Sequence, residues 1–454
     1  MNSMSIAPER PAFELAPSSG SGPAPAPTSA HRADVQRESF TQAQSPDVHL
    51  SIYDDLSTLE SDWHAFESDA DHTFFQSFAW LAAWHRNVGV RSHTVPAVVT
   101  GTRADGSLLF ILPLAIQPRG GVRVLCFLGS DLCDYNAPLL HPKFDDAMAG
   151  RTFASVWNDV LKSLRADGRF AHDLIRLEKM PERVGSQVNP FMALPTTPNP
   201  SGAHLAALSG TWDEFYKLKR SSSTRKKERS QLRQLGQFGE VRFVDALEGQ
   251  ERLRTLDVLF AQKASSFARM GVGNIFALPG HRELLTDFVM DPRVRHLVHL
   301  SRLEIGDTIA AASIGLTDAG CYSLVLSSYE GAGEMARLGP GRAHINELIG
   351  YALKAGFKTF DFTIGDEAYK LDWSDVRLTL HDHRSASSLL GAVALTGLSG
   401  FWTVKRAIKQ NPMLWRLFSR TRSLMGALRT RSPLEAQSAS RRNSVRDEHK
   451  GSDA

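Results

Sequence analysis

Residues 337–373 decide the fold of this chain, and they read RLGPGRAHINELIGYALKAGFKTFDFTIGDEAYKLDW. The stretch opens with a loop at 339–341 (GPG) that has no large side chain. Apolar residues then recur at helical spacing over 345–353, and a short run at 359–362 alternates as a strand does. This pattern predicts a glycine loop that opens a helix, with a strand after it.

The glycine loop has the composition of an anion-binding site. The first backbone N–H groups of a helix lack intrahelical partners, and the helix dipole favours negative charge there. We therefore expect this turn to hold a phosphate, with arginines adding positive charge on either side. A tight turn without a ligand is the alternative interpretation. The residues predicted to hold the anion are Arg337, Gly339, Pro340, Gly341, Arg342, Ala343 and His344.

Composition indicates a globular protein with tails. The 454 residues are 42% hydrophobic and 22% charged, and the net charge of +3 is too small to argue for a nucleic-acid partner. Only three cysteines occur, without a C-x-x-C, so neither a disulfide framework nor a zinc site is expected. No signal peptide and no apolar run of about 20 residues stands out, so we expect a cytoplasmic protein.

The order of predicted elements repeats, which suggests a duplicated α/β (α+β) unit. Each copy reads as an antiparallel meander, a helix and a final strand, so each predicts a mixed, largely antiparallel sheet flanked by helices. A Pro- and Gly-rich joint at 196–204 separates the copies. The predicted parts are a disordered leader (1–46), a first half (47–195), a second half with the only cofactor site (205–384), and a basic amphipathic tail with a disordered end (385–454).

Two segments carry concentrated positive charge. Residues 217–233 hold eight Lys or Arg against one Glu, which suits a neighbouring phosphate-bearing cofactor better than nucleic acid, because no aromatic residues are interleaved. The tail contains no acid from 385 to 434, and its apolar residues form one helical face. Residues 398–430 therefore predict either a peripheral membrane contact or a helix docked on the protein itself.

The ordered series of segments resembles one known family. The segments are FFQSFAWLAAWHRNVG, DYNAPLLHP, RKKERSQLRQLGQFGEV, the glycine-loop stretch and KRAIKQNPMLWRL. Over roughly residues 48–425 the chain is similar to GNAT-superfamily acetyltransferases of the cellulose or exopolysaccharide biosynthesis (CelD-like) type. These are distantly related to Fem aminoacyl transferases and are built from two tandem GNAT-like units. The family loop is [QR]-x-x-G-x-[GA], whereas Arg337 stands one position closer to Gly339.

The resemblance implies acyl transfer from acetyl-CoA, without a metal, to an amine or hydroxyl acceptor such as a glycan precursor. The loop would hold the pyrophosphate of the CoA, and a polar cluster follows the last predicted strand. There, Asp366 or Glu367 would act as base and Tyr369 would protonate the thiolate. Lys370 would neutralise developing charge, as the similarly placed lysine of the Fem relatives is thought to do.

Two other functions remain open from the sequence. One is a Fem-like transferase that uses aminoacyl-tRNA, which would engage the basic segment. The other is a catalytically silent scaffold on the inner face of the membrane. A competing dinucleotide motif, G-x-G-x-x-A at Gly331, Gly333 and Ala336, is set aside because a second glycine loop intervenes before the helix.

Overall fold

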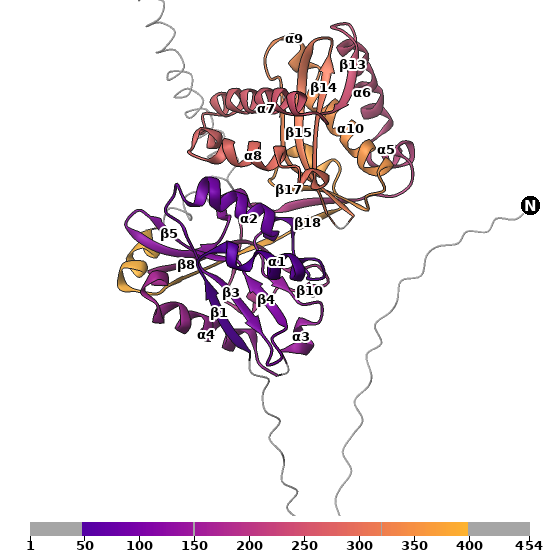
Figure 1. Ribbon diagram of the computed structural model, residues 1–454. Helices are drawn as coiled ribbons and strands as arrows, with labels where there is room; N and C mark the ends of the chain where they lie inside the picture. Colours follow the sequence, from indigo (N-terminus) through magenta and orange to yellow (C-terminus); the bar gives the residue numbers. More distant parts are fainter. Residues whose placement is uncertain (1–47, 149, 319, 398–454) are drawn as a thin grey trace, which may run out of the picture. The chain divides into compact units, whose positions relative to one another are not determined.

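The computed structural model describes residues 48–148, 150–318 and 320–397 (Figure 1). The predicted leader at 1–46 and the predicted membrane segment at 398–430 lie outside the described residues. The described chain is a mixed α/β structure in which helices flank the sheets, as the sequence predicted.

The first half contains two sheets where the sequence predicted one. Residues 108–112 and 114–119 are strands of different sheets, and they meet at Pro113, which has no N–H to donate to a sheet. One sheet has the order β1-β3-β4-β7, with β1 His49–Tyr53, β3 Val98–Thr102, β4 Leu108–Leu112 and β7 Leu139–Leu140. The other has the order β11-β19-β8-β6-β5-β2, with β2 Val95–Pro96, β5 Leu114–Arg119, β6 Val122–Phe127, β8 Leu174–Pro181, β11 Thr197–Pro198 and β19 Leu380–Ala386.

The helices of the first half follow their caps and apolar stripes. Ser77 accepts the N–H of Trp80 at the start of α2, and the tryptophans of this helix are buried. Thr152 caps α4 in the same way, through the N–H of Ser155. The helices are α1 Glu60–Glu67, α2 Phe78–Trp84, α3 Phe144–Ala147 and α4 Phe153–Ala166; a small β9–β10 ladder spans Arg183–Val184 and Gln187–Val188.

The second half is one seven-stranded sheet with the order β13-β14-β15-β16-β17-β12-β18. Its strands are β12 Ala203–Ala207, β13 Val241–Asp245, β14 Val298–Ile305, β15 Thr308–Asp318, β16 Cys321–Tyr329, β17 Thr359–Ile364 and β18 Val376–Leu378. Its helices are α5 Trp212–Lys219, α6 Ser222–Leu235, α7 Gly249–Met270, α8 His281–Met290, α9 Gly333–Arg337, α10 Pro340–Lys354 and α11 Ala368–Leu371. α10 packs with Phe360 and Phe362 on one face, and α7 and α8 pack in a separate core with Ile314.

The predicted repeat is present in the strand pairing. β6 and β8 pair in parallel and are joined through α4, whereas β16 and β17 pair in parallel and are joined through α10. Parallel strands require such a crossover, so both halves use the same meander, helix and strand.

The two halves also exchange a strand, which the sequence did not indicate. β12 follows the first half in the chain but pairs with β17, and β19 follows the second half but pairs with β8. In both pairings the receiving strand, β17 or β8, carries the extra residue of a bulge, and a non-glycine residue with positive φ lies there, Thr363 (58°) or Lys179 (61°). The limits 47–195 and 205–384 stay predictions, with the addition that residues 380–386 complete the first half's sheet.

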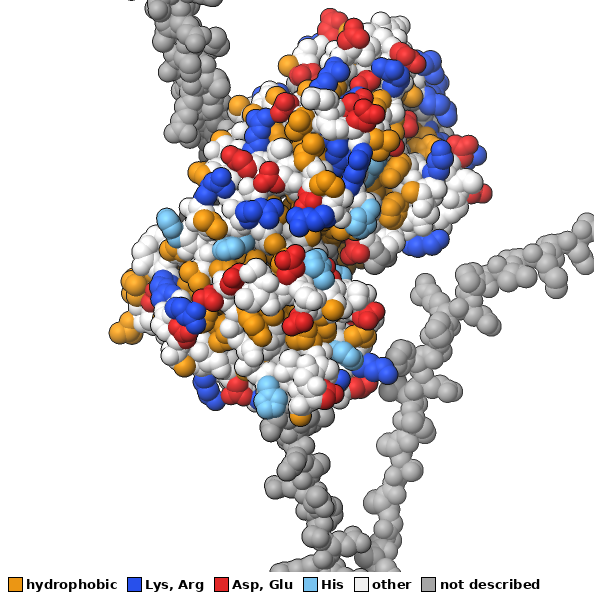
Figure 2. Space-filling model, viewed as in Figure 1, with side chains coloured by type: hydrophobic (Ala, Val, Ile, Leu, Met, Phe, Trp, Pro, Cys, Tyr) orange, Lys and Arg blue, Asp and Glu red, His pale blue; other side chains and the backbone are white. Residues whose placement is uncertain are grey.

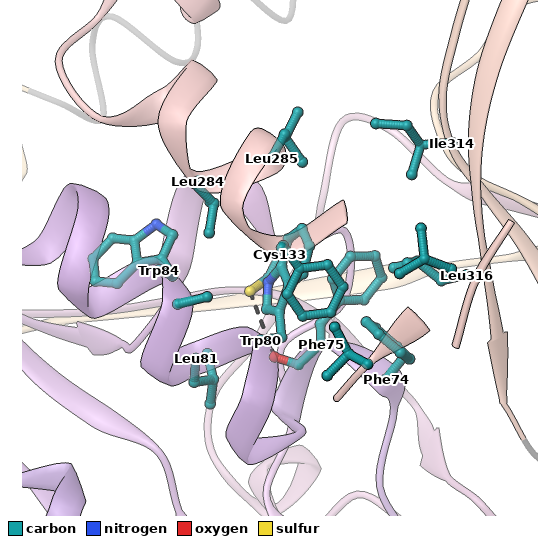
Figure 3. Packing of buried hydrophobic residues seen from close by; sticks show 14 of the residues in the cluster. Phe74, Phe75, Trp80, Leu81, Trp84, Cys133, Leu284, Leu285, Ile314 and Leu316 are labelled. Atoms are coloured by element: carbon teal, nitrogen blue, oxygen red, sulfur yellow. Dashed lines mark hydrogen bonds between the residues drawn. The ribbon is translucent and has the colours of Figure 1, made fainter. Parts of the chain in front are cut away.

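One apolar core joins the halves (Figure 3). Phe74 and Trp80 of the first half pack edge-to-face on Phe288 of α8, with ring centroids 6.1 and 5.1 Å apart. Figure 3 shows Phe74 and Trp80 in one core with Leu284, Leu285, Ile314 and Leu316 of the second half. Burial of such large rings is the main stabilising contribution here, at roughly 25 cal/mol per Å² of apolar surface.

Candidate functional site

The glycine loop opens a helix, as predicted. α10 begins at Pro340, and Gly339 before it has the left-handed φ of 73° that favours glycine. The structure narrows the set of available donors, because the N–H groups of Arg342 and Ala343 both donate to the Gly339 carbonyl. Pro340 has no N–H, so Gly341 supplies the first-turn donor left for a ligand. No side chain caps this helix start.

A cavity of about 430 Å³ lies against the start of α10. Among the described residues that line it, four are cationic and none is acidic. The lining consists of Arg220, Lys227, Gln231, Ser327, Ser328, Tyr329, Ala336, Arg337, Gly339, Gly341, Arg342, His344, Ile345, Tyr369 and Trp373. Four cations and a helix dipole that point at one hollow favour an anion of high charge.

The basic segment 217–233 forms α5 and α6 with a break between them, and it borders this cavity. At the break, the guanidinium of Arg220 is buried between Glu228 (2.6 Å) and Asp372 (3.0 Å) and lies 4.8 Å from the centroid of the Trp373 ring. Arg220 is therefore held in one orientation, with its charge largely neutralised by two carboxylates. The predicted placement of a basic helix beside the anion site matches this geometry.

The remaining cations reach the cavity from exposed positions. Lys227 on α6 and Arg337 on α9 are exposed, and Arg342 donates to the side-chain oxygen of Gln231 at 3.2 Å. Figure 2 shows Lys and Arg side chains gathered over α6. Exposed side chains of this kind can close on a ligand without breaking a buried contact.

His344 is uncharged in this site. Burial lowers the pKa of its imidazole to about 3, and its Nε2 lies 3.0 Å from the Ser313 hydroxyl. Its Nδ1 is buried and has no hydrogen-bond partner among the described residues. His344 therefore contributes a polar ring atom to the cavity wall and no positive charge.

The predicted catalytic cluster is divided by the structure. Tyr369 lines the cavity, and burial, together with the Glu367 carboxylate, raises the pKa of its hydroxyl, which keeps the hydroxyl protonated. Lys370 is buried; its Nζ donates to the Ile364 carbonyl (2.8 Å) and pairs with Glu367 (3.0 Å). Asp366 is exposed and lies 3.4 Å from the guanidinium of Arg377. Asp366, Glu367 and Lys370 do not line the cavity.

Sequence reasoning missed several residues of this region. Ser327, Ser328 and Trp373 were given no role in the site, although all three line the cavity. Lys263 on α7 was also missed; its pKa is lowered by burial and by nearby Lys370 but raised by Glu367, so it lies beside the polar cluster. One signal in the sequence could have pointed to this region. Asp361 is an acid inside an apolar strand, and buried carboxylates are rare without partners.

Known proteins match the chain at the level of domain and fold. Residues 222–371 match the family described as an acetyltransferase (GNAT) domain, so the chain carries a domain of this type. This range contains the glycine loop, the basic helix α6 and the polar cluster. No curated protein matches the chain.

One solved structure supports the fold at a TM-score of 0.50, and two others are similar at lower scores. The crystal structure of FemX has a TM-score of 0.50 at 9% identity and covers 71% of this chain and 95% of its own. A tandem GNAT protein from the clavulanic acid biosynthesis pathway has a TM-score of 0.41 at 8% identity, covering 75% and 98%. A conserved protein of unknown function from Bacteroides thetaiotaomicron has a TM-score of 0.45 at 12% identity, covering 74% and 99%. The CelD-like subtype has no counterpart among these matches.

The described residues form neither a metal site nor a membrane span. Within 48–148, 150–318 and 320–397, no three His, Cys, Asp or Glu side chains gather closely enough to hold a metal ion. In the same ranges, every helix is too short or too polar to cross a membrane.

Proposed function

We propose that this protein transfers an acyl group from acyl-CoA to an amine or hydroxyl. The single observation that carries the proposal is the cavity at the start of α10, where Gly341 leaves a backbone donor and three exposed cations join the paired Arg220 in a lining that holds no acid. CoA carries a pyrophosphate and a further phosphate, which suit such a site. A second hollow of about 260 Å³ shares Gln231, Gly339 and Arg342 with it and extends the room toward Trp212.

The reaction needs one proton removed and one supplied. The acceptor N or O attacks the thioester carbonyl, the new C–N or C–O bond forms, and the C–S bond breaks with release of CoA thiolate. The proton lost by the acceptor must finally reach that thiolate. Tyr369 supports this step because it lines the cavity and its hydroxyl stays protonated. Glu367 is the better-placed base candidate, since it sits in the Lys370 network and Asp366 is turned to Arg377.

The acceptor is proposed to be a glycan precursor in bacterial polysaccharide or envelope biosynthesis, in line with the sequence resemblance. Fem-like use of aminoacyl-tRNA is the alternative donor chemistry. A silent scaffold is disfavoured by the cationic cavity, because a scaffold has no need to gather the exposed cations Lys227, Arg337 and Arg342 at a helix start.

Calorimetry with acetyl-CoA tests the donor directly. We expect saturable binding that weakens with salt, because phosphate contacts dominate, and release of thiol from acetyl-CoA in the presence of a competent acceptor. Mass spectrometry of the native purified protein would identify a retained CoA. Binding of aminoacyl-tRNA without binding of acyl-CoA would transfer the proposal to the Fem-like donor, and binding of neither would favour the scaffold.

A peripheral membrane contact is proposed for the end of the chain. Residues 389–397 are helical and expose Leu389 (89%), Leu390 (52%) and Val393 (73%). The sequence that follows, 398–430, contains Lys and Arg but no Asp or Glu, which suits an anionic lipid surface at about 1 kcal/mol for each basic residue near it. Vesicle co-sedimentation should show salt-sensitive binding that is lost on truncation after Ala386. Equal pelleting of full-length and truncated protein contradicts it.

A further inference from the structure

A hydrogen bond between the halves reaches the strand that leads into the acyl site. The hydroxyl of Tyr135, from the segment before β7, lies 2.8 Å from both carboxylate oxygens of Asp361 on β17. Tyr135 and Asp361 are 7% and 4% exposed. Their residue numbers differ by more than 200, so this bond exists only when the two halves are assembled.

Asp361 lies where β17 leaves its parallel partner. Ser323 opposite Asp361 is the last register pair between β16 and β17. Because side chains alternate along a strand, Phe360 and Phe362 face α10 while Asp361 faces the first half. Two residues further on, the Thr363 hydroxyl bridges back to the Leu324 carbonyl at 3.2 Å.

The carboxylate also sets the local backbone. It accepts the N–H of Thr363 at 2.7 Å, and Thr363 holds a φ of 58°, which a β-branched residue adopts only under constraint. That turn directs the carbonyls of Thr363 and Ile364 at the Nζ of Lys370, at 3.4 and 2.8 Å. Lys370 is next in sequence to Tyr369, which lines the cavity.

We propose that Tyr135 of the first half is a positioning residue of the acyl-transfer site, acting through the Asp361 carboxylate. The chain of contacts runs from Tyr135 to Asp361, then through Thr363 to Lys370 and its neighbour Tyr369. The first half thus completes the site in the second half. This inference rests on the proposed acyl transfer, but its protonation consequence is measurable without an acceptor.

Asp361 is placed to titrate near neutral pH. Burial raises its pKa to about 7, against the hydrogen bonds from Thr363 and Tyr135, which lower it. The titratable groups that face it are Asp134, Tyr135, Cys321 and Lys370. Asp134 raises the pKa of Asp361 and Lys370 lowers it. The carboxylate that fixes Thr363 therefore changes its charge near pH 7.

The test compares Tyr135→Phe with Tyr322→Phe in the full-length protein. Tyr322 is also buried, and its hydroxyl lies 2.8 Å from His299 Nδ1, so the control loses an equivalent hydroxyl contact away from Asp361. Loss of the Tyr135 donor should raise the Asp361 pKa further. The acid limb of the rate of thiol release from acetyl-CoA should then move to higher pH, with kcat lowered at least tenfold at pH 7 and acetyl-CoA affinity within twofold of the parent.

A second measurement does not need turnover. Titration of the Asp361 carboxyl by carbon-detected NMR should show a higher midpoint in Tyr135→Phe than in the parent and an unchanged one in Tyr322→Phe. Equal midpoints and equal pH profiles in all three proteins overturn the proposal. Absence of acetyl-CoA binding in the parent would instead contradict the proposed function, while the carboxyl titration would still decide whether Tyr135 controls Asp361.

Discussion

The two halves of this chain share one architecture, a parallel strand pair joined through a helix, but the starts of the two helices differ. In the first half, the helix α4 after the meander is capped by its own Thr152, which accepts the Ser155 N–H at 3.3 Å. In the second half, α10 starts at Gly339 without a side-chain cap and borders a cationic cavity. The first-turn N–H groups bond in the same way in both helices, so the cavity and its exposed cations are what make the second helix start suited to an anion.

The strands after these helices also differ, because the first half has an apolar residue where the second half has a polar one. In the exchanged pairing, Leu177 of β8 stands opposite His383, and Asp361 of β17 stands opposite Leu205. Each position is two residues before a positive-φ residue, Lys179 or Thr363, so the two are structurally equivalent. The first half fills the place with a leucine and the second with a carboxylate. The duplicated frame therefore packs in one copy and carries polar groups in the other.

The largest effect on ligand binding is expected from a side chain placed at the start of α10. Gly339→Asn places a side chain at the cavity, and asparagine tolerates the positive φ of this residue. A Cβ there would come no closer than 3.6 Å to another atom, the Arg342 guanidinium, so the fold should hold. We expect acetyl-CoA affinity to fall at least 100-fold by calorimetry, which is about 2.7 kcal/mol.

Gly333→Asn is the matched control for that change. Gly333 has a φ of 78°, a Cβ added there would meet open space, and the residue does not line the cavity. It should keep the affinity of the parent. Gly341 is less suitable for this experiment, because a Cβ there would lie 2.9 Å from the Tyr329 ring and disturb packing as well as binding. Equal loss in both asparagine variants would remove the glycine loop from the site.

The sequence predicted the frame of the site better than its chemistry. The repeat, the glycine loop and the basic segment were readable because they rest on local periodicity and composition. The strand exchange was not, because the partners of β12 and β19 are chosen by tertiary packing and not by local sequence. Tyr135 and Asp361 meet only in the assembled fold, so neither sequence neighbourhood indicates the other. Lys370 was placed among catalytic groups, and its carbonyl contacts at the end of β17 could not be foreseen.

The carboxylate of Asp361 in β17 should make the free energy of unfolding depend on pH. The folded-state pKa of Asp361 is raised to about 7 from an ordinary value of 3.8, so the folded protein binds the proton more tightly than the unfolded chain. Stability from this group is then greatest at low pH and falls as pH rises from about 4 to about 7. Asp361→Asn removes that loss, and we expect it to be more stable than the parent at pH 8 by at most about 4 kcal/mol.

The comparison between pH values is what identifies the group. The stability gap between Asp361→Asn and the parent, from urea unfolding, should shrink as pH falls to about 4, and Asp62→Asn on the exposed surface of α1 should show no such trend. A gap that stays constant over this range would show that Asp361 is ionised throughout. The carboxylate would then be a permanent anchor for Tyr135, and the two halves would differ in charge at all working pH values.

The smallest effect is expected from a single exposed cation at the cavity. Lys227 lines the cavity from α6, and its neighbour Lys226 is equally exposed but does not line it. Lys227→Ala should weaken acetyl-CoA binding about 3- to 10-fold, since a charge-assisted contact contributes roughly 1 kcal/mol at a solvated site. The loss should diminish as salt is raised, because screening removes the same interaction. Lys226→Ala should change affinity by less than twofold. If both variants lose affinity equally, the basic segment acts as a diffuse field over α6, and the geometry of the cavity is not what distinguishes the second half from the first.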